Sequence, residues 1–120
     1  MSDYLMPEEN VICLTRGDTG KFKFQRKNAE GHVILTAPDA IYFTVKRSFE
    51  SSSVMFQKTL EDMTLDQDGM YHFTIAPADT AALDYGNYVY DVEVTELDYV
   101  QTISKGKLNL LEEATWYTNK

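Results

Sequence analysis

The chain has 120 residues, which is about the length of one domain. Its composition, 43% hydrophobic and 25% charged, excludes intrinsic disorder. The net charge of −8 argues against partners that are nucleic acids or anionic membranes, because both repel a negative surface.

The first half of the chain contains short runs in which apolar and polar residues alternate, the pattern of half-buried β-strands. These runs predict strands over residues 11–15, 21–25, 41–46 and 54–59, and a short stretch over 33–36 would add one more. Turn-forming residues separate them, and the serine-rich segment 48–53 is expected to be a loop.

The second half shows the same alternation over 71–75 and, most clearly, in a strand that Gly86 opens. Residues 77–83 are the one segment typical of a helical turn, with proline near its start. A long last strand is expected over 99–111. Its apolar residues change from odd to even numbers, and we place the bulge that absorbs this change at Gly106.

Short strands with turns every ~8–12 residues predict an all-β immunoglobulin-like β-sandwich of seven to eight mostly antiparallel strands, with one short helical turn. The sandwich would span residues 11–111, between an N-terminal extension (1–10) and a C-terminal tail (112–120). Its predicted core comprises Phe22, Phe24, Ile41, Phe43, Val45, Phe56, Tyr71, Phe73, Tyr88, Tyr90, Val92, Val94 and Leu108.

Residues 83–90, Leu-Asp-Tyr-Gly-Asn-Tyr-Val-Tyr, resemble the corner that enters the sixth strand of an immunoglobulin domain. The resemblance implies that the Tyr88 hydroxyl bonds back to the preceding loop and that Tyr90 occupies the site of a cysteine. Cys13 is the only cysteine, so no intramolecular disulfide can form and packing must hold the fold.

A broader resemblance rests on four segments in order: 14–19 (LTRGDT), 41–46 (IYFTVK), 86–92 (GNYVYDV) and 106–108 (GKL). Together they resemble small tail-associated proteins of phages and prophages of Gram-positive hosts, and are similar to the N-terminal module of baseplate upper proteins. The resemblance covers about residues 11–111. It implies a structural protein of the tail or baseplate region that binds other virion or tail proteins.

The motifs that resemble integrin-binding or metal-binding sites have simpler structural interpretations. Arg16-Gly17-Asp18 matches the integrin-binding tripeptide but also suits a turn between strands. The run 66–69 (DQDG) resembles half of a calcium loop but lacks the carboxylate at its twelfth position. His32 and His72 have no further ligand at a metal spacing. We therefore expect no metal, no cofactor and no enzymatic activity, since no nucleophile or phosphate-loop motif is present either.

Aromatic residues outside the predicted core are the candidate contact residues: Trp116 and Tyr117 in the tail, and Tyr42 and Tyr99 on strands. Trp and Tyr are enriched at interface hot spots. A homo-oligomer formed through the tail or an open strand edge is a further expectation, and the lysines at 21, 23, 105 and 107 would guard such edges.

The alternative function is an accessory carbohydrate-binding sandwich, in which Tyr42, Tyr99 and Trp116 would form one planar row on one face. The first residues lack the basic and apolar regions of a signal peptide. No apolar run approaches the ~20 residues of a membrane helix. We expect the protein in the virion, or in the host cytoplasm during assembly.

Overall fold

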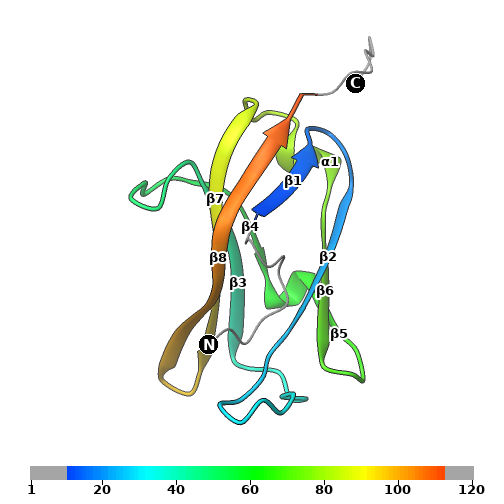
Figure 1. Cartoon of the computed structure of the whole chain (residues 1–120), viewed down its shortest axis with the longest axis vertical. Coiled ribbons are helices and arrows are strands. Elements are labelled where there is room, and N and C mark those ends of the chain that lie inside the picture. The colour runs from blue at the N-terminus through cyan, green and yellow to red at the C-terminus, as the bar shows by residue number, and fades with distance from the viewer. Residues whose placement is uncertain (1–10, 113–120) are drawn as a thin grey trace.

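A computed structural model describes residues 11–112 of the chain. They form two β-sheets packed face to face (Figure 1), which confirms the predicted all-β sandwich. The strands are β1 (Val11–Thr15), β2 (Gly20–Gln25), β3 (Ala40–Lys46), β4 (Val54–Thr59), β5 (Thr64–Leu65), β6 (Met70–Ile75), β7 (Gly86–Glu96) and β8 (Tyr99–Leu111). The helical elements are the 3-10 turn Leu60–Asp62 and α1 (Pro77–Thr80).

The larger sheet has the order β1-β8-β7-β3-β4, and the smaller sheet has the order β2-β6-β5. If β2, β3, β4, β5, β6, β7 and β8 are taken as immunoglobulin strands B, C, C′, D, E, F and G, these are the two sheets of that fold. All strand pairs among residues 11–112 are antiparallel except β1 with β8. Residues 33–36 form no strand: Val33 makes a single bridge to Lys27, and the eighth strand is the short β5.

In the core, a series of contacting aromatic rings joins the two sheets at the place where an immunoglobulin domain has its disulfide. Tyr90 of β7 packs on Phe43 of β3 with ring centroids 5.5 Å apart, and Phe43 lies 4.8 Å from Phe73 of β6. Phe73 in turn contacts Phe24 of β2 at 6.3 Å. Aromatic pairs at these separations stabilise the fold beyond their buried area. Packing thus replaces the covalent link that the free Cys13 cannot provide.

The tyrosine corner is present as the resemblance implied. The Tyr88 hydroxyl donates a 2.7 Å hydrogen bond to the carbonyl of Asp84, four residues upstream. Tyr88 and Tyr90 are both buried. The corner therefore fixes the loop that leads from α1 into β7.

The predicted bulge exists, but its placement at Gly106 is wrong. Gly106 pairs regularly with Tyr90, whereas the register shifts where Val92 and Glu93 face Ser104 and Thr102. Ile103 is the extra residue, so it and Ser104 both point inward and both are buried. The extra residue explains why the buried apolar residue before the bulge has an odd number, whereas Leu108 and Leu110 after it have even numbers.

Two predicted core residues are only partly buried. Phe22 lies on β2 and Phe56 on β4, and both strands are edges of their sheets in the described part of the chain, so one flank of each ring has no neighbouring strand. The prediction omitted five residues of the buried hydrophobic core: Ile12, Leu14, Ile75, Ile103 and Leu110.

Candidate interaction surface at the hairpin end

The turn between β7 and β8 holds a leucine in an unfavourable backbone conformation. Leu97 and Asp98 connect the paired residues Glu96 and Tyr99. Leu97 has a φ of 51°, and no other non-glycine residue in the described range has a positive φ. A positive φ at the first turn residue alone is the pattern of a type II′ turn, where glycine is the usual residue. A side chain in this region costs roughly 1–2 kcal/mol.

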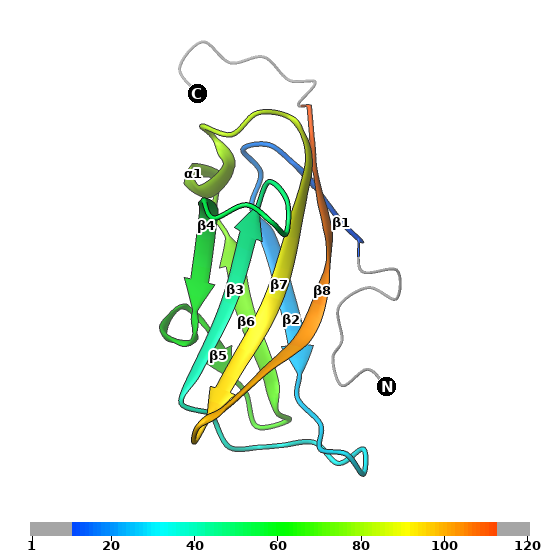
Figure 2. The same ribbon diagram turned by 90° about the vertical axis from the view of Figure 1, so that its left-hand side faces the viewer.

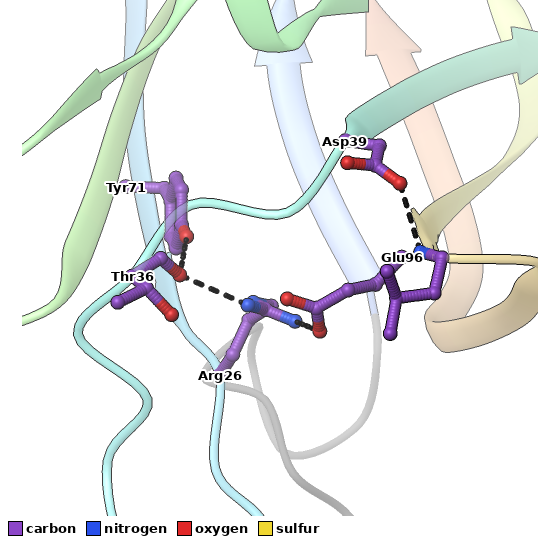
Figure 3. Close-up of polar contacts among 6 residues, drawn as sticks. Arg26, Thr36, Asp39, Tyr71 and Glu96 are labelled. Atoms are coloured by element: carbon purple, nitrogen blue, oxygen red, sulfur yellow. Dashed lines mark hydrogen bonds and ion pairs between the residues drawn. The ribbon is translucent and has the colours of Figure 1, made fainter.

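A carboxylate from a neighbouring connection holds this turn in place (Figure 3). Asp39 Oδ2 accepts a 2.8 Å hydrogen bond from the Leu97 N–H. The Asp39 N–H donates to the carbonyl of Thr95 at 3.0 Å. The β2–β3 connection is thereby fastened to the β7–β8 hairpin at two points. These bonds offset part of the cost of the strained turn.

A buried arginine braces the same end of the sandwich (Figure 3). Arg26 is 6% exposed; its Nη1 donates to Glu96 Oε1 at 3.3 Å and its Nη2 to the Thr36 carbonyl at 3.0 Å. The Tyr71 hydroxyl donates to the same carbonyl at 3.4 Å. A buried charge requires such partners, so Arg26 ties the hairpin to the smaller sheet.

Apolar side chains are exposed around this braced turn. Leu97 is 81% exposed, Tyr99 67% and Val100 57%, and Leu35 of the β2–β3 connection is 60% exposed. Figure 2 shows the hairpin and that connection at the same end of the molecule. We call the surface formed by Leu97, Tyr99 and Val100 the hairpin end; Leu35 lies beside Gly69 of the β5–β6 turn instead. Exposed apolar groups gathered at one place are typical of binding surfaces.

Unpaired backbone extends this surface along β8. Residues 107–111 pair with β1, but within the described chain residues 99–106 have no strand on the side away from β7. In an antiparallel ladder successive residues point their N–H and C=O groups alternately toward and away from the partner. Every second residue of this stretch therefore offers both groups to an added strand.

The hairpin end is acidic. Leu97 is flanked in the sequence by Glu96 and Asp98, and its N–H is bonded to Asp39. The basic partner of Glu96, Arg26, is itself buried. A partner would thus meet an apolar tip within a negative rim.

The predicted contact residues do not form one surface. Tyr99 belongs to the hairpin end, whereas Tyr42 is partly buried in β3 and pairs with Glu93. Glu93 and Glu96 are three residues apart on β7, so Tyr42 and Tyr99 lie on opposite faces of the sheet. Trp116 and Tyr117 lie outside the described residues. The planar row of the carbohydrate-binding alternative is therefore not formed by the two tyrosines that can be placed.

Sequence reasoning missed Leu97 and Val100. Leu97 could have been found, because a leucine in the first position of a two-residue hairpin turn contradicts the usual preference for glycine or asparagine. The exposure of Val100 carries no sequence signal, since this residue looks like an ordinary core candidate.

Tyr42 lines a shallow groove on the outer face of the larger sheet. The groove has a volume of about 360 Å³ and is lined by Tyr42, Thr44, Lys46, Val54, Gln57, Asp91 and Glu93. Burial raises the pKa of Asp91 above its ordinary value, and the positive charges of Lys46 and Lys105 partly counteract this. The groove combines one aromatic ring with several hydrogen-bonding side chains.

The remaining motifs serve the fold. Arg16-Gly17-Asp18 forms the turn after β1, where the Gly17 N–H donates to the buried hydroxyl of Thr80 at 2.9 Å. Asp66 closes the β5–β6 turn by accepting the N–H groups of Asp68 and Met70 and by contacting His72 Nε2 at 2.8 Å. Across residues 11–112, no three His, Cys, Asp or Glu side chains are grouped so as to hold a metal ion.

Comparison with known proteins finds no family model that matches this chain and no matching sequence among curated proteins. In the described range no helix has the length and apolar character needed to cross a membrane.

Proposed function

We propose that this chain is a structural protein of a phage or prophage tail or baseplate region, and that it works by binding other virion proteins. The observation that supports a binding role is Leu97, which is 81% exposed and held at a positive φ by Asp39. The fold alone gains nothing from an exposed leucine in a position that glycine would fill without strain. The virion assignment itself rests on the sequence resemblance.

The chemistry of the hairpin end indicates the kind of partner. Tyr99 and Val100 point to opposite faces of β8, so an apolar pocket for these residues and Leu97 must enclose the tip of the hairpin. The carboxylates around the tip favour a basic rim on that pocket. The unpaired edge of β8 would add main-chain hydrogen bonds to an extended segment of the same partner. The partner is thus a protein with an apolar, basic-rimmed pocket.

The experiment is incorporation into particles. Virions from a producing strain that carries a tagged copy of the gene are purified, and the tagged chain is quantified in intact particles. Leu97→Asn should lower its incorporation at least tenfold, because asparagine tolerates the turn but cannot fill an apolar pocket. Phe49→Asn is the matched control, since Phe49 is 49% exposed in the loop at the other end of β3.

Absence of the unmodified chain from purified particles would contradict the role in the finished virion. Equal incorporation of the Leu97 and Phe49 variants would contradict the hairpin end as the contact surface. Self-association is tested separately by light scattering of the full chain and of a chain ending at Leu111. A defined oligomer that becomes a monomer on truncation would show that residues 112–120 carry the self-association.

The groove that contains Tyr42 favours the accessory carbohydrate-binding role as a second candidate. A sugar ring could stack on Tyr42 while Gln57, Asp91 and Glu93 accept or donate hydrogen bonds. A glycan array probed with the wild-type chain and with Tyr42→Ala tests this role. Binding that Tyr42→Ala removes would support it, and no binding to any glycan would contradict it.

A further inference from the structure

A hollow near the start of β7 is lined by positive and hydrogen-bond-donating side chains. It has a volume of about 300 Å³, and Arg47, Asn87, Tyr88, Val89, Lys107 and Asn109 line it. Asn87 faces Asn109 across the β7–β8 ladder, and Val89 faces Lys107. We call it the Arg47 hollow.

Arg47 is exposed, and its guanidinium rests on a buried aromatic ring. It lies over the Tyr88 ring, 4.6 Å from its centroid, and that ring is buried and fixed by its bond to Asp84. Arg47 Nη2 and Nη1 are 3.6 and 3.9 Å from the position that a Cβ on Gly86 would occupy. Gly86 has a φ of 132°, so a larger residue there is both strained and close to the guanidinium. An ordered guanidinium loses less entropy on binding.

The charges of the hollow are unbalanced. None of its lining residues is acidic, although the chain as a whole has a net charge of −8. Within residues 11–112, neither Arg47 nor Lys107 forms an ion pair. Two cations and two side-chain amides thus converge on one space in an otherwise acidic protein.

We propose that the Arg47 hollow binds a carboxylate group. A guanidinium presents parallel N–H groups that match the two oxygens of a carboxylate, and the Lys107 ammonium adds a second positive charge. The amides of Asn87 and Asn109 supply further donors. This binding site is independent of the virion role and of the hairpin end.

The test is a titration of the full-length ¹⁵N-labelled chain with sodium acetate, against sodium chloride at the same ionic strength. Acetate should produce saturating shifts in the side-chain amide signals of Asn87 and Asn109 and in Arg47 Nε–H, while chloride should not. Arg47→Ala should abolish the saturating shifts of the amides. Arg47→Lys should weaken binding roughly tenfold, because it keeps the charge but loses the paired donors.

Arg16→Ala is the matched control. Arg16 also lies over a tyrosine ring, 4.3 Å from the Tyr85 centroid, but does not line the hollow. Its loss should leave acetate binding unchanged. Equal shifts with chloride, or saturating shifts that persist in Arg47→Ala, would overturn the proposal.

A second arm identifies the source of the carboxylate. The same titration is repeated with the dipeptide acetyl-Glu-Glu-amide. Binding at least tenfold tighter than that of acetate would assign the site to an acidic segment of a protein. Equal binding per carboxylate would assign it to a small molecule.

Discussion

Tyrosines stand at both ends of the β7–β8 ribbon and have opposite environments. Tyr88, near the start of β7, is 2% exposed and its hydroxyl is bonded to the carbonyl of Asp84. Tyr99, at the other end, is 67% exposed, and residues 99–102 are all exposed on both faces of β8. The difference shows that cover by the second sheet, rather than residue type or strand, decides whether an aromatic residue stabilises the fold or remains available for contact.

The two ends also handle their turns differently. The first residue of β7, which has a positive φ, is a glycine, whereas the hairpin end has Leu97 at such a position. The first arrangement carries no strain. The second is maintained by Asp39 and braced by Arg26, which keeps the strained turn in place at the proposed contact surface.

The largest expected effect on stability is the difference between removing a buried aromatic ring and removing an exposed one. Phe43→Ala should lower the free energy of unfolding by about 3–5 kcal/mol, because it leaves a cavity beside Tyr90 and Phe73. Tyr99→Ala, the matched change at the exposed end, should alter it by less than about 0.5 kcal/mol. Urea denaturation measures both. A large loss for Tyr99→Ala would mean that the ring supports the fold.

Arg26→Met tests the brace at the hairpin end. Methionine keeps much of the side-chain volume but leaves the Thr36 carbonyl without its arginine donor, so we expect a loss of about 1–3 kcal/mol. Glu96 adds little to this loss, because its side chain is 42% exposed. Hydrogen exchange should show faster opening of residues 95–100 than in the wild type. A variant as stable as the wild type would show that the brace is dispensable.

Tyr88→Phe removes only the hydroxyl of the tyrosine corner. The Asp84 carbonyl loses a 2.7 Å hydrogen bond, which should cost about 1 kcal/mol. Urea denaturation measures this loss. A variant as stable as the wild type would show that the hydroxyl contributes nothing to the stability of the fold.

Leu97→Gly should stabilise the chain, by about 0.5–1 kcal/mol. Relief of the left-handed strain outweighs the extra freedom that glycine gives the unfolded chain. Asp98→Gly is the control: Asp98 has no positive φ, so glycine there should destabilise by a similar amount. Thermal unfolding compares the three chains. A less stable Leu97→Gly variant would show that the leucine side chain contributes to the fold.

The smallest effect concerns the β5–β6 turn. The hydrogen bond from His72, followed by that from the Met70 N–H, holds the pKa of Asp66 below its ordinary value of 3.8. A lowered folded-state pKa gives stability that is present above the unfolded value and lost as the pH falls through the folded one. Asp66→Asn should therefore be less stable than the wild type at pH 7, and this difference in the free energy of unfolding should disappear in acid. Asp68→Asn, with no side-chain bond in the described structure, should show no such trend.

Most of the fold follows from local sequence. Alternation located seven of the eight strands, and Gly86-Asn87-Tyr88 predicted the corner. The two-residue β5 was not recognised, because so short a strand has no measurable periodicity. The bulge was recognised from the change of phase but misplaced, since a glycine is only one of several residues at which a strand can gain an extra position.

Less of the candidate site could be predicted. Of the four expected contact residues, Tyr99 is on the hairpin end, Tyr42 is on the opposite face, and Trp116 and Tyr117 lie outside the described chain. The Arg47 hollow was not foreseen, because its residues come from three segments whose positions depend on strand register.

The sequence by itself determined the all-β class, the buried phase of the long strands except around the bulge in β8, and the absence of an intramolecular disulfide. These depend on side-chain polarity at a spacing of two and on residue counts, which need no tertiary information. Only the tertiary structure decided which apolar residues stay exposed and which distant side chains meet. Burial depends on where the second sheet ends, and the meeting of Arg26 with Glu96, or of Arg47 with Lys107, depends on pairing between strands far apart in the chain.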